Sequence, residues 1–223
     1  MTTQHIEQIW IIESAESENF DPPEDYSFET LSYTAFEQKI SRTNEKKPLL
    51  TFAVLYDIAE LKKLASLKAN LQFFYLINLT EQNLSRQDAD FADGIIHLKE
   101  TQLNKLHQMI AAATINPGLI NIDLSDLQKT IDKKSVRFYS QDFHYANLEQ
   151  ELNHFLSQDK TDLSAAQFIL VMIVSGMSFS LEQFSLIGEL IGEQAPKAKI
   201  MIGTGLEFEG YDESLSLQLL IDA

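Results

Sequence analysis

Short apolar runs alternate with helical patterns along the first half of the chain, and this alternation constrains the fold more than any other feature. Three apolar runs of strand length cover residues 49–55, 71–79 and 94–98. Asp57 caps a helix after the first run, and the apolar face of that helix is formed by Ile58, Leu61, Leu64 and Leu67. A second helix is predicted over 101–115. Strand, helix, strand, loop, strand and helix at this spacing predict a parallel sheet with right-handed crossovers.

The second half of the chain has a different rhythm. Helices are predicted over 124–133, around Leu148, Leu152, Phe155 and Leu156, and after a capping box formed by Ser180 and Gln183. The apolar face of that last helix is predicted from Leu181, Phe184, Ile187, Leu190 and Ile191. Strands are predicted over 136–143, 168–175, 199–206 and 215–222, with a polar turn at Gly210 between the last two. We therefore place a domain boundary at about Asn116, giving domains 1–115 and 116–223 with helix 101–115 as the joint.

The N-terminal region is strongly acidic. A buried strand carrying Trp10 is predicted over 6–12. Residues 13–29 then contain seven carboxylates, no Lys or Arg, and two consecutive prolines, which predicts a solvated loop that disfavours anions. Residues 28–40 are ambiguous, with helix slightly favoured.

Composition excludes several classes of protein. The 223 residues are 44% hydrophobic and 22% charged, which is typical of a globular protein, and the formal charge of −16 disfavours nucleic acids and acidic membranes as partners. No apolar run reaches the roughly 18 residues of a membrane span. The absence of cysteine excludes disulfides and thiolate metal sites and agrees with a cytoplasmic protein. The five histidines lack the spacing of a metal site, so no metal is expected.

One loop carries an amide and two carboxylates in the pattern N-x-D-x-x-D. It begins with Pro117 and Gly118 and continues through Asn121, Asp123 and Asp126 into the helix predicted from Leu124. One interpretation is helix capping, in which Asn121 or Asp123 accepts the first free N–H groups. The alternative is a surface that faces a partner, and the two roles are compatible.

From Ala92 onward the chain resembles FtsZ, the bacterial tubulin homologue that polymerises into the division ring. The matching stretches are Ala-Asp-Gly-Ile-Ile at 92–96, the loop 117–123 with Asp126, Asp-Leu-Ser-Ala-Ala at 162–166, Leu-Glu-Gln-Phe at 181–184 and Ile-Gly-Thr-Gly-Leu at 202–206. The loop resembles the synergy loop of the family, whose carboxylates position the attacking water on the GTP of the next subunit. The resemblance implies an α/β tubulin/FtsZ-like fold: a truncated Rossmann-like N-terminal domain, a central helix, and an α+β C-terminal domain with a four-stranded sheet.

The first 90 residues depart from the family. FtsZ holds GTP with glycine-rich loops, because backbone N–H groups must reach the phosphates without an intervening β-carbon. This chain has no glycine before Gly94, and Asp57 stands at the helix start that an anion would use. We therefore expect no nucleotide cofactor and no GTPase activity, so that the chain would be a pseudo-GTPase.

The resemblance implies a function through the remaining half of a shared site. Our first hypothesis is a non-catalytic FtsZ-like accessory protein, which binds FtsZ or another tubulin-like protein through Pro117, Gly118, Asn121, Asp123 and Asp126 and caps or modulates filaments. The alternative is a decayed structural module that self-associates or binds an unrelated partner without affecting FtsZ. A residual nucleotide-dependent enzyme is a third hypothesis.

Overall fold

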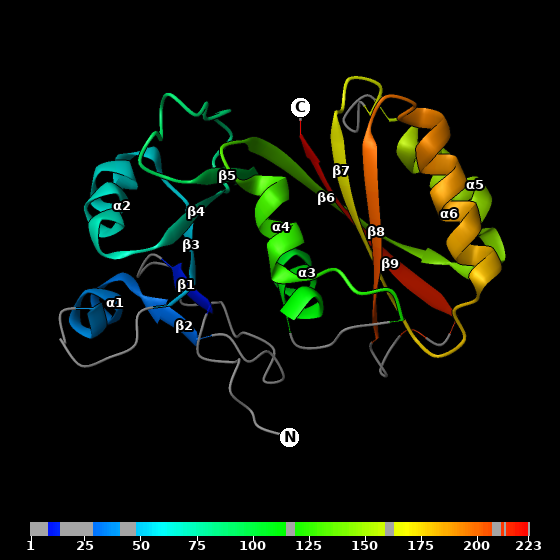
Figure 1. Ribbon diagram of the computed structural model, residues 1–223, viewed down its shortest axis with the longest axis horizontal. Coiled ribbons are helices and arrows are strands. Elements are labelled where there is room, and N and C mark those ends of the chain that lie inside the picture. Colours follow the sequence, from blue (N-terminus) through cyan, green and yellow to red (C-terminus); the bar gives the residue numbers. More distant parts are fainter. Residues whose placement is uncertain are drawn as a thin grey trace. The chain divides into compact units, whose positions relative to one another are not determined.

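The computed structural model describes residues 9–13, 29–40, 48–114, 119–158, 163–206, 211 and 213–222 (Figure 1). Contacts between residues group the chain into two compact units. Unit 1 comprises Met1–Asn104 with Ile131–Ser135, and unit 2 comprises Lys105–Thr130 with Val136–Ala223. The predicted boundary at Asn116 lies outside the described residues, and the division into 1–115 and 116–223 stays a prediction.

Unit 1 is built on a parallel sheet. Its strands are β1 (Ile9–Glu13), β2 (Glu29–Ser32), β3 (Leu50–Leu55), β4 (Phe73–Asn78) and β5 (Gly94–His97). They are hydrogen-bonded in the order β2-β1-β3-β4-β5, and all four neighbouring pairs are parallel, as the alternation of strands and helices predicted. The helical elements are α1 (Tyr33–Ile40), η2 (Ile58–Glu60), α2 (Leu61–Leu67), η3 (Lys68–Asn70) and η4 (Glu100–Gln102). The ambiguous stretch 28–40 therefore contains a short strand as well as a helix.

The core of unit 1 lies between the sheet and these helices. Trp10 of β1 packs edge-to-face on Phe36 of α1, with ring centroids 5.7 Å apart, and Leu64 and Leu67 of α2 are buried in the same cluster. Strand β3 is buried along its whole length, which is typical of a central strand in a parallel sheet.

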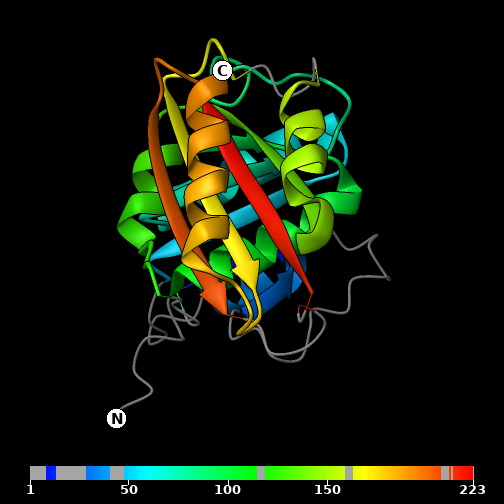
Figure 2. The same cartoon turned by 90° about the vertical axis from the view of Figure 1, so that its right-hand side faces the viewer.

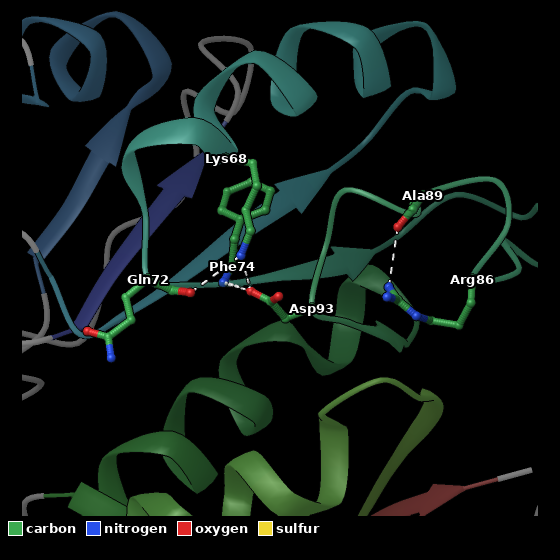
Figure 3. A network of polar contacts seen from close by, with 6 residues as sticks. All are labelled: Lys68, Gln72, Phe74, Arg86, Ala89 and Asp93. Carbon is green, nitrogen blue, oxygen red and sulfur yellow. Dashed lines mark hydrogen bonds and ion pairs between the residues drawn. The ribbon is translucent and has the colours of Figure 1, made fainter.

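Asp93 fastens the start of β5 to its neighbours. Its Oδ2 accepts a hydrogen bond from the Phe74 N–H at 2.7 Å and pairs with the Lys68 ammonium, which also donates to the Gln72 carbonyl at 3.4 Å (Figure 3). Nearby, the guanidinium of Arg86 donates to the Ala89 carbonyl at 3.3 Å. These contacts are all internal to unit 1 and hold the connection between β4 and β5.

Helix α4 (Leu124–Ile131) ends two residues before its predicted end. Lys133 adopts a left-handed backbone conformation with φ of 60°, and its N–H donates to the Asp93 carbonyl at 2.6 Å. A β-carbon at Gly94 would lie 2.3 Å from the Ile131 carbonyl oxygen, so glycine is required there by the close approach of the chain.

Unit 2 contains a mixed array of strands with two helices on one face. The strands are β6 (Ser135–His144), β7 (Phe168–Ser175), β8 (Lys199–Leu206) and β9 (Ser214–Asp222), and the helices are α3 (Leu103–Thr114), α4, α5 (Leu148–Leu156) and α6 (Leu181–Gln194), with η5 (Tyr145–Asn147). Strand β9 pairs antiparallel with β6 and β7, whereas β7 and β8 are parallel. Helices α5 and α6 pack on alternate residues of β7 and β9. Figure 2 shows both helices in front of these strands.

Two expectations for the C-terminal region are corrected by the structure. The nine described strands form a single mixed sheet in the order β2-β1-β3-β4-β5-β6-β9-β7-β8, so no separate four-stranded sheet is present among them. Leu181, which we predicted on the buried face of its helix, is exposed, because it is the first residue of α6. The buried face of α5 and the Ser180–Gln183 capping box are confirmed, whereas the predicted turn at Gly210 lies outside the described residues.

No helix in the described part of the chain has the length and apolarity needed to cross a membrane.

Candidate functional site

The loop that leads into α4 is fastened to the outer edge of β8. The N–H of Thr204 donates to the Ile120 carbonyl at 2.8 Å, and the N–H of Ile120 donates to the Thr204 hydroxyl at 3.0 Å. Strand β8 is the last strand in the described sheet order, so these bonds use backbone and side-chain groups at a sheet edge. The backbone of the loop is therefore fixed at Ile120.

A second contact fixes the same loop two residues later. The Ile122 side chain is buried against Gly203, where an added β-carbon would lie only 2.5 Å from Ile122 Cγ1. Leu119 and Ile120, by contrast, are 83% and 37% exposed. One apolar side chain of the loop thus anchors it, while two others face solvent.

Asp123 and Asp126 cap helix α4 reciprocally. Asp123 Oδ1 accepts the N–H of Asp126 at 2.9 Å, and Asp126 Oδ2 accepts the N–H of Asp123 at 3.4 Å. Asp126 Oδ1 also pairs with the Lys129 ammonium at 3.3 Å. This is the geometry of a capping box with two carboxylates, so the capping interpretation of the N-x-D-x-x-D pattern is confirmed for Asp123, and Asp126 accepts a hydrogen bond in return.

The loop residues that the sequence singled out have different positions. Asn121 and Asp123 are exposed, and Asp126 is partly covered. Pro117 and Gly118 lie outside the described residues. The loop therefore presents an amide, a carboxylate and two apolar side chains at one surface, and its role toward a partner stays a prediction.

The carboxyl edge of the parallel sheet in unit 1 is the usual place for a ligand in an α/β fold. Here β1 ends in Glu13, which is buried, and Asp57 follows β3. Asp57 Oδ1 accepts the N–H of Ala59 at 2.9 Å, and its carbonyl accepts the N–H of Glu60 at 3.0 Å. The backbone donors that begin this helix are thus bonded to the chain itself, as the prediction for Asp57 required.

A small cavity lies at this edge among the described residues. This cavity of about 10 Å³, enough for roughly one water molecule, is lined by Ile12, Glu13, Tyr33, Val54, Glu60, Lys63 and Leu64. The Lys63 ammonium lies 3.7 Å from the centroid of the Tyr33 ring. The lining of this cavity thus combines two carboxylates, Glu13 and Glu60, with one lysine, which contacts an aromatic ring.

Comparison with known proteins gives a consistent assignment. No family model matches the chain. The cell division protein FtsZ of Haemophilus influenzae is 36% identical over 107 residues, which cover 44% of this chain. Among solved structures, a mutant FtsZ from M. jannaschii superposes with a TM-score of 0.51 at 16% identity over 79% of the chain. TubZ from Bacillus thuringiensis serovar israelensis, in GDP-form protofilaments, gives a TM-score of 0.58 at 10% identity over 85% of the chain.

The chain is similar to FtsZ in sequence over 44% of its length, and it has the fold of the FtsZ and TubZ structures. The resemblance to FtsZ inferred from residues 92–223 is thereby confirmed. The chain covers only part of its relatives: the aligned segment spans 25% of the Haemophilus FtsZ, and the superposed regions span 57% and 65% of the FtsZ and TubZ structures.

Sequence reasoning missed a polar network in unit 2. The Lys105 ammonium donates to Asp142 Oδ1 at 2.7 Å and to the Tyr211 hydroxyl at 2.9 Å. Burial alone would lower the pKa of Lys105, but the hydrogen bonds to Asp142 and Tyr211 hold this pKa above its usual value. Next to it, the buried Gln218 amide donates to Gln108 Oε1 at 2.7 Å. The signal in the sequence was the spacing of Lys105 and Gln108, which puts two polar side chains three residues apart on one face of the helix.

The network and the loop have no features of a metal centre. Within the described ranges, no group of three or more His, Cys, Asp or Glu side chains is placed to hold a metal ion.

Proposed function

We propose that this protein is a non-catalytic FtsZ-like accessory protein that acts in cell division by binding FtsZ. In this proposal, the loop of Leu119–Asp126 docks on the nucleotide face of an FtsZ subunit, and this docking caps or modulates a filament. The sequence similarity to the cell division protein FtsZ of Haemophilus influenzae supports the choice of partner and process. The cytoplasm is the compartment that we predict for this activity.

One observation carries the proposal. The loop is held on β8 by the Ile120–Thr204 bonds and by Ile122 on Gly203, yet it keeps Leu119 almost fully exposed. A fixed backbone with an outward apolar side chain suits a contact surface, because little conformational entropy is lost when a partner binds.

The absence of GTPase activity is part of the same proposal. It is supported by the carboxylates of Glu13 and Asp57 at the carboxyl edge of the parallel sheet, where their charge opposes a triphosphate. It is also supported by the hydrogen bonds that already occupy the first amides after β3.

Self-association is the second candidate function. The solved relatives include an FtsZ dimer from M. jannaschii and TubZ protofilaments, so the family fold is found in assemblies of identical subunits. The formal charge of −16 on each copy opposes such an assembly of this chain, and we therefore rank it second.

The test mixes the purified chain with FtsZ from the same organism and GTP, and measures FtsZ sedimentation and GTP turnover. We expect the chain to change the amount of sedimented FtsZ in a dose-dependent manner. Leu119→Ser should reduce the effect several-fold, whereas the matched control Leu119→Met, which keeps an apolar side chain, should retain it. FtsZ assembly that is the same with and without the chain would overturn the proposal.

A further inference from the structure

A groove lies on the helical layer of unit 2, between the start of α5 and the first turns of α6, and Figure 2 shows both helices on the side that faces the viewer. It has a volume of about 490 Å³, within the range of roughly 300–1,000 Å³ that is usual for binding sites. The polar residues that line it are Tyr145, Asn147, Glu149, Gln150, Asn153 and Gln183. Four of these six carry a carboxamide, which makes the groove rich in groups that both donate and accept hydrogen bonds.

Three of the carboxamides follow one another at intervals of three residues. Asn147 ends η5 at the start of α5, and Gln150 and Asn153 lie in α5, so that successive members of the series are neighbours on the helix surface. The step of six residues from Asn147 to Asn153 spans about 9 Å at the helical rise. An extended peptide covers that length in about three residues. The series therefore has the length of a short extended segment.

Within the described part of the chain, the hydrogen bonds of these side chains leave donors and acceptors on the groove. Asn153 Nδ2 donates to the Glu149 carbonyl at 3.0 Å, which leaves Oδ1 as the acceptor. Gln183 Oε1 accepts the Ser180 N–H at 2.8 Å, which leaves the amide nitrogen as the donor. The Asn147 side chain makes no capping hydrogen bond, although asparagine is a preferred capping residue. A peptide main chain needs both kinds of group, because each residue presents one N–H and one carbonyl.

The border of the groove is negatively charged. Glu149 lines it, and Glu182 and Glu189 lie on α6 four residues before and three residues after Leu186, which is also in the lining. All three glutamates are exposed. The sequence from 138 to 196 contains a single lysine and no arginine. The groove therefore attracts a cationic side chain and repels carboxylates and phosphates.

Tyr145 adds an aromatic ring to the lining. Its N–H donates to the Glu213 carbonyl at 3.0 Å, and its side chain packs against the core of unit 2, so that the residue is fixed beside the first residue of β9. The face of a tyrosine ring attracts guanidinium and ammonium groups. A ring and a carboxylate in one groove are complementary to the side chain of arginine or lysine.

We propose that this groove binds a partner protein through an extended segment of about three residues that carries Lys or Arg. The carboxamides of Asn147, Gln150 and Asn153 bond to the main chain of the segment, and Glu149 and Tyr145 receive its basic side chain. Recognition of the main chain tolerates many sequences, whereas the carboxylate and the ring select the charge. The groove shares no residue with the loop before α4, so this site is independent of the proposed function.

The probe is the capped peptide acetyl-Gly-Arg-Val-Arg-Gly-amide, titrated into the full chain at pH 7.5, roughly one unit above the usual pKa of histidine. Binding is followed by the NMR signals of the backbone and side-chain amides. We expect the side-chain amide signals of Asn147 and Gln150 to shift as the peptide binds. The same peptide with glutamine in place of both arginines should bind about fivefold or more weakly, because it lacks the ion pairs.

Two variants and one matched control locate the contacts. Asn147→Ala with Gln150→Ala removes two carboxamides at exposed positions and should weaken peptide binding about fivefold or more, with an unchanged melting temperature. If the double variant melts lower, Gln150→Ala alone serves the same purpose. Glu149→Gln should weaken binding about two- to fivefold. Glu193→Gln removes the same charge at an exposed position near the end of α6, outside the lining, and should bind like the parent.

Three outcomes would overturn the proposal. A parent that does not bind the arginine peptide at millimolar concentration, or a double alanine variant that binds it as the parent does, would show that the carboxamides do not hold a main chain. Equal binding of the glutamine peptide would show that the acidic border does not select the charge. Displacement of the peptide by an equal concentration of spermidine, a cation without peptide bonds, would assign the groove to a free polyamine. Each of these results leaves the binding of FtsZ untouched, so the two proposals fail separately.

Discussion

The side chain of Ile122 fills the space that a β-carbon on Gly203 would occupy. An ideal β-carbon there would lie 2.5 Å from Ile122 Cγ1 and 2.6 Å from Ile122 Cδ1. Gly203, the first glycine of the Ile-Gly-Thr-Gly-Leu stretch at 202–206, thus makes room for Ile122 in the loop before α4. The neighbouring Thr204 is hydrogen-bonded to Ile120 of the same loop. Two motifs that resemble family landmarks at separate places in the sequence are parts of one contact.

We predict that Gly203→Ala destabilises the protein by about 1–3 kcal/mol, because the methyl group forces the Ile122 side chain or the loop to move. Ile122→Ala should cost about 2–5 kcal/mol through the cavity it leaves. The double variant should cost less than the sum, because the space vacated by one residue accepts the other. Urea unfolding of the four proteins measures this coupling.

Gly192→Ala is the matched control for the glycine substitution. A β-carbon at Gly192 meets nothing within 4 Å, and the residue lies in α6, where alanine is favoured over glycine by about 0.5–1 kcal/mol. This variant should therefore be slightly more stable than the parent. A strictly additive Gly203–Ile122 pair would contradict the packing described above.

Leu106 lies in helix α3, is completely buried, and tests the role of that helix in the core. Leu106→Ala should lower the free energy of unfolding by about 2–5 kcal/mol. The exposed Asn104→Ala change on the same helix is the control and should stay within about 0.5 kcal/mol of the parent. A cost below about 1 kcal/mol for Leu106→Ala would show that the helix does not stabilise the fold as its burial indicates.

Features controlled by neighbours in sequence could be predicted, and those controlled by distant contacts could not. The caps at Asp57, Asp123 and Ser180 depend on groups within four residues, and the structure confirms all three. Strand β7 was predicted with its observed ends because a continuous apolar run between polar residues marks them.

The features that the sequence did not predict depend on contacts between residues far apart in the chain. Strand β2 was not separated from α1, because its only described partner strand is β1, about twenty residues earlier. The end of α4 depends on the bond from Lys133 to Asp93, and the single sheet depends on pairings between distant strands. At the candidate site, the sequence identified Asn121, Asp123 and Asp126 but gave no sign that Gly203 and Thr204 hold their loop.

His107 makes stability sensitive to acid. Its ring is buried on α3, and burial lowers the pKa of His107 from 6.5 to about 4. Between these two pH values the unfolded chain binds the proton and the folded chain does not, so the free energy of unfolding falls as the pH drops from about 6.5 to about 4. The loss is about 1.4 kcal/mol per pH unit at most.

Urea unfolding between pH 7.5 and pH 5 measures this dependence. His107→Gln should flatten the pH dependence, whereas His154→Gln, at an exposed position of α5, should leave it unchanged. If His107→Gln does not fold, the ring of His107 in the parent can be followed by NMR. A ring that titrates near pH 6.5 in the folded protein would show that this histidine does not cause the acid sensitivity.

We predict that the chain does not bind GTP, GDP or ATP. The amides after β3 are bonded to Asp57, and the carboxylates of Glu13 and Asp57 repel phosphate. Isothermal titration calorimetry in millimolar magnesium should show no heat of binding. The variant Asp57→Ser, which keeps the cap and removes its charge, tests whether the carboxylate is the main obstacle to nucleotide binding. Micromolar affinity of the parent for GTP, GDP or ATP would contradict the proposal of a lost nucleotide site.

The last prediction separates the two roles of Asp123, since its carboxylate caps α4 and is also exposed on the proposed docking surface. Asp123→Ala removes the acceptor of the Asp126 N–H and should cost about 0.5–2 kcal/mol, a few degrees of melting temperature in a protein of this size. Asp123→Asn keeps an oxygen acceptor, because asparagine caps helices about as well as aspartate, and removes only the charge. If the charge contributes to docking, Asp123→Asn should melt like the parent but change the effect on FtsZ sedimentation several-fold. An asparagine variant that acts on FtsZ as the parent does, beside an alanine variant that is merely less stable, would limit Asp123 to starting the helix.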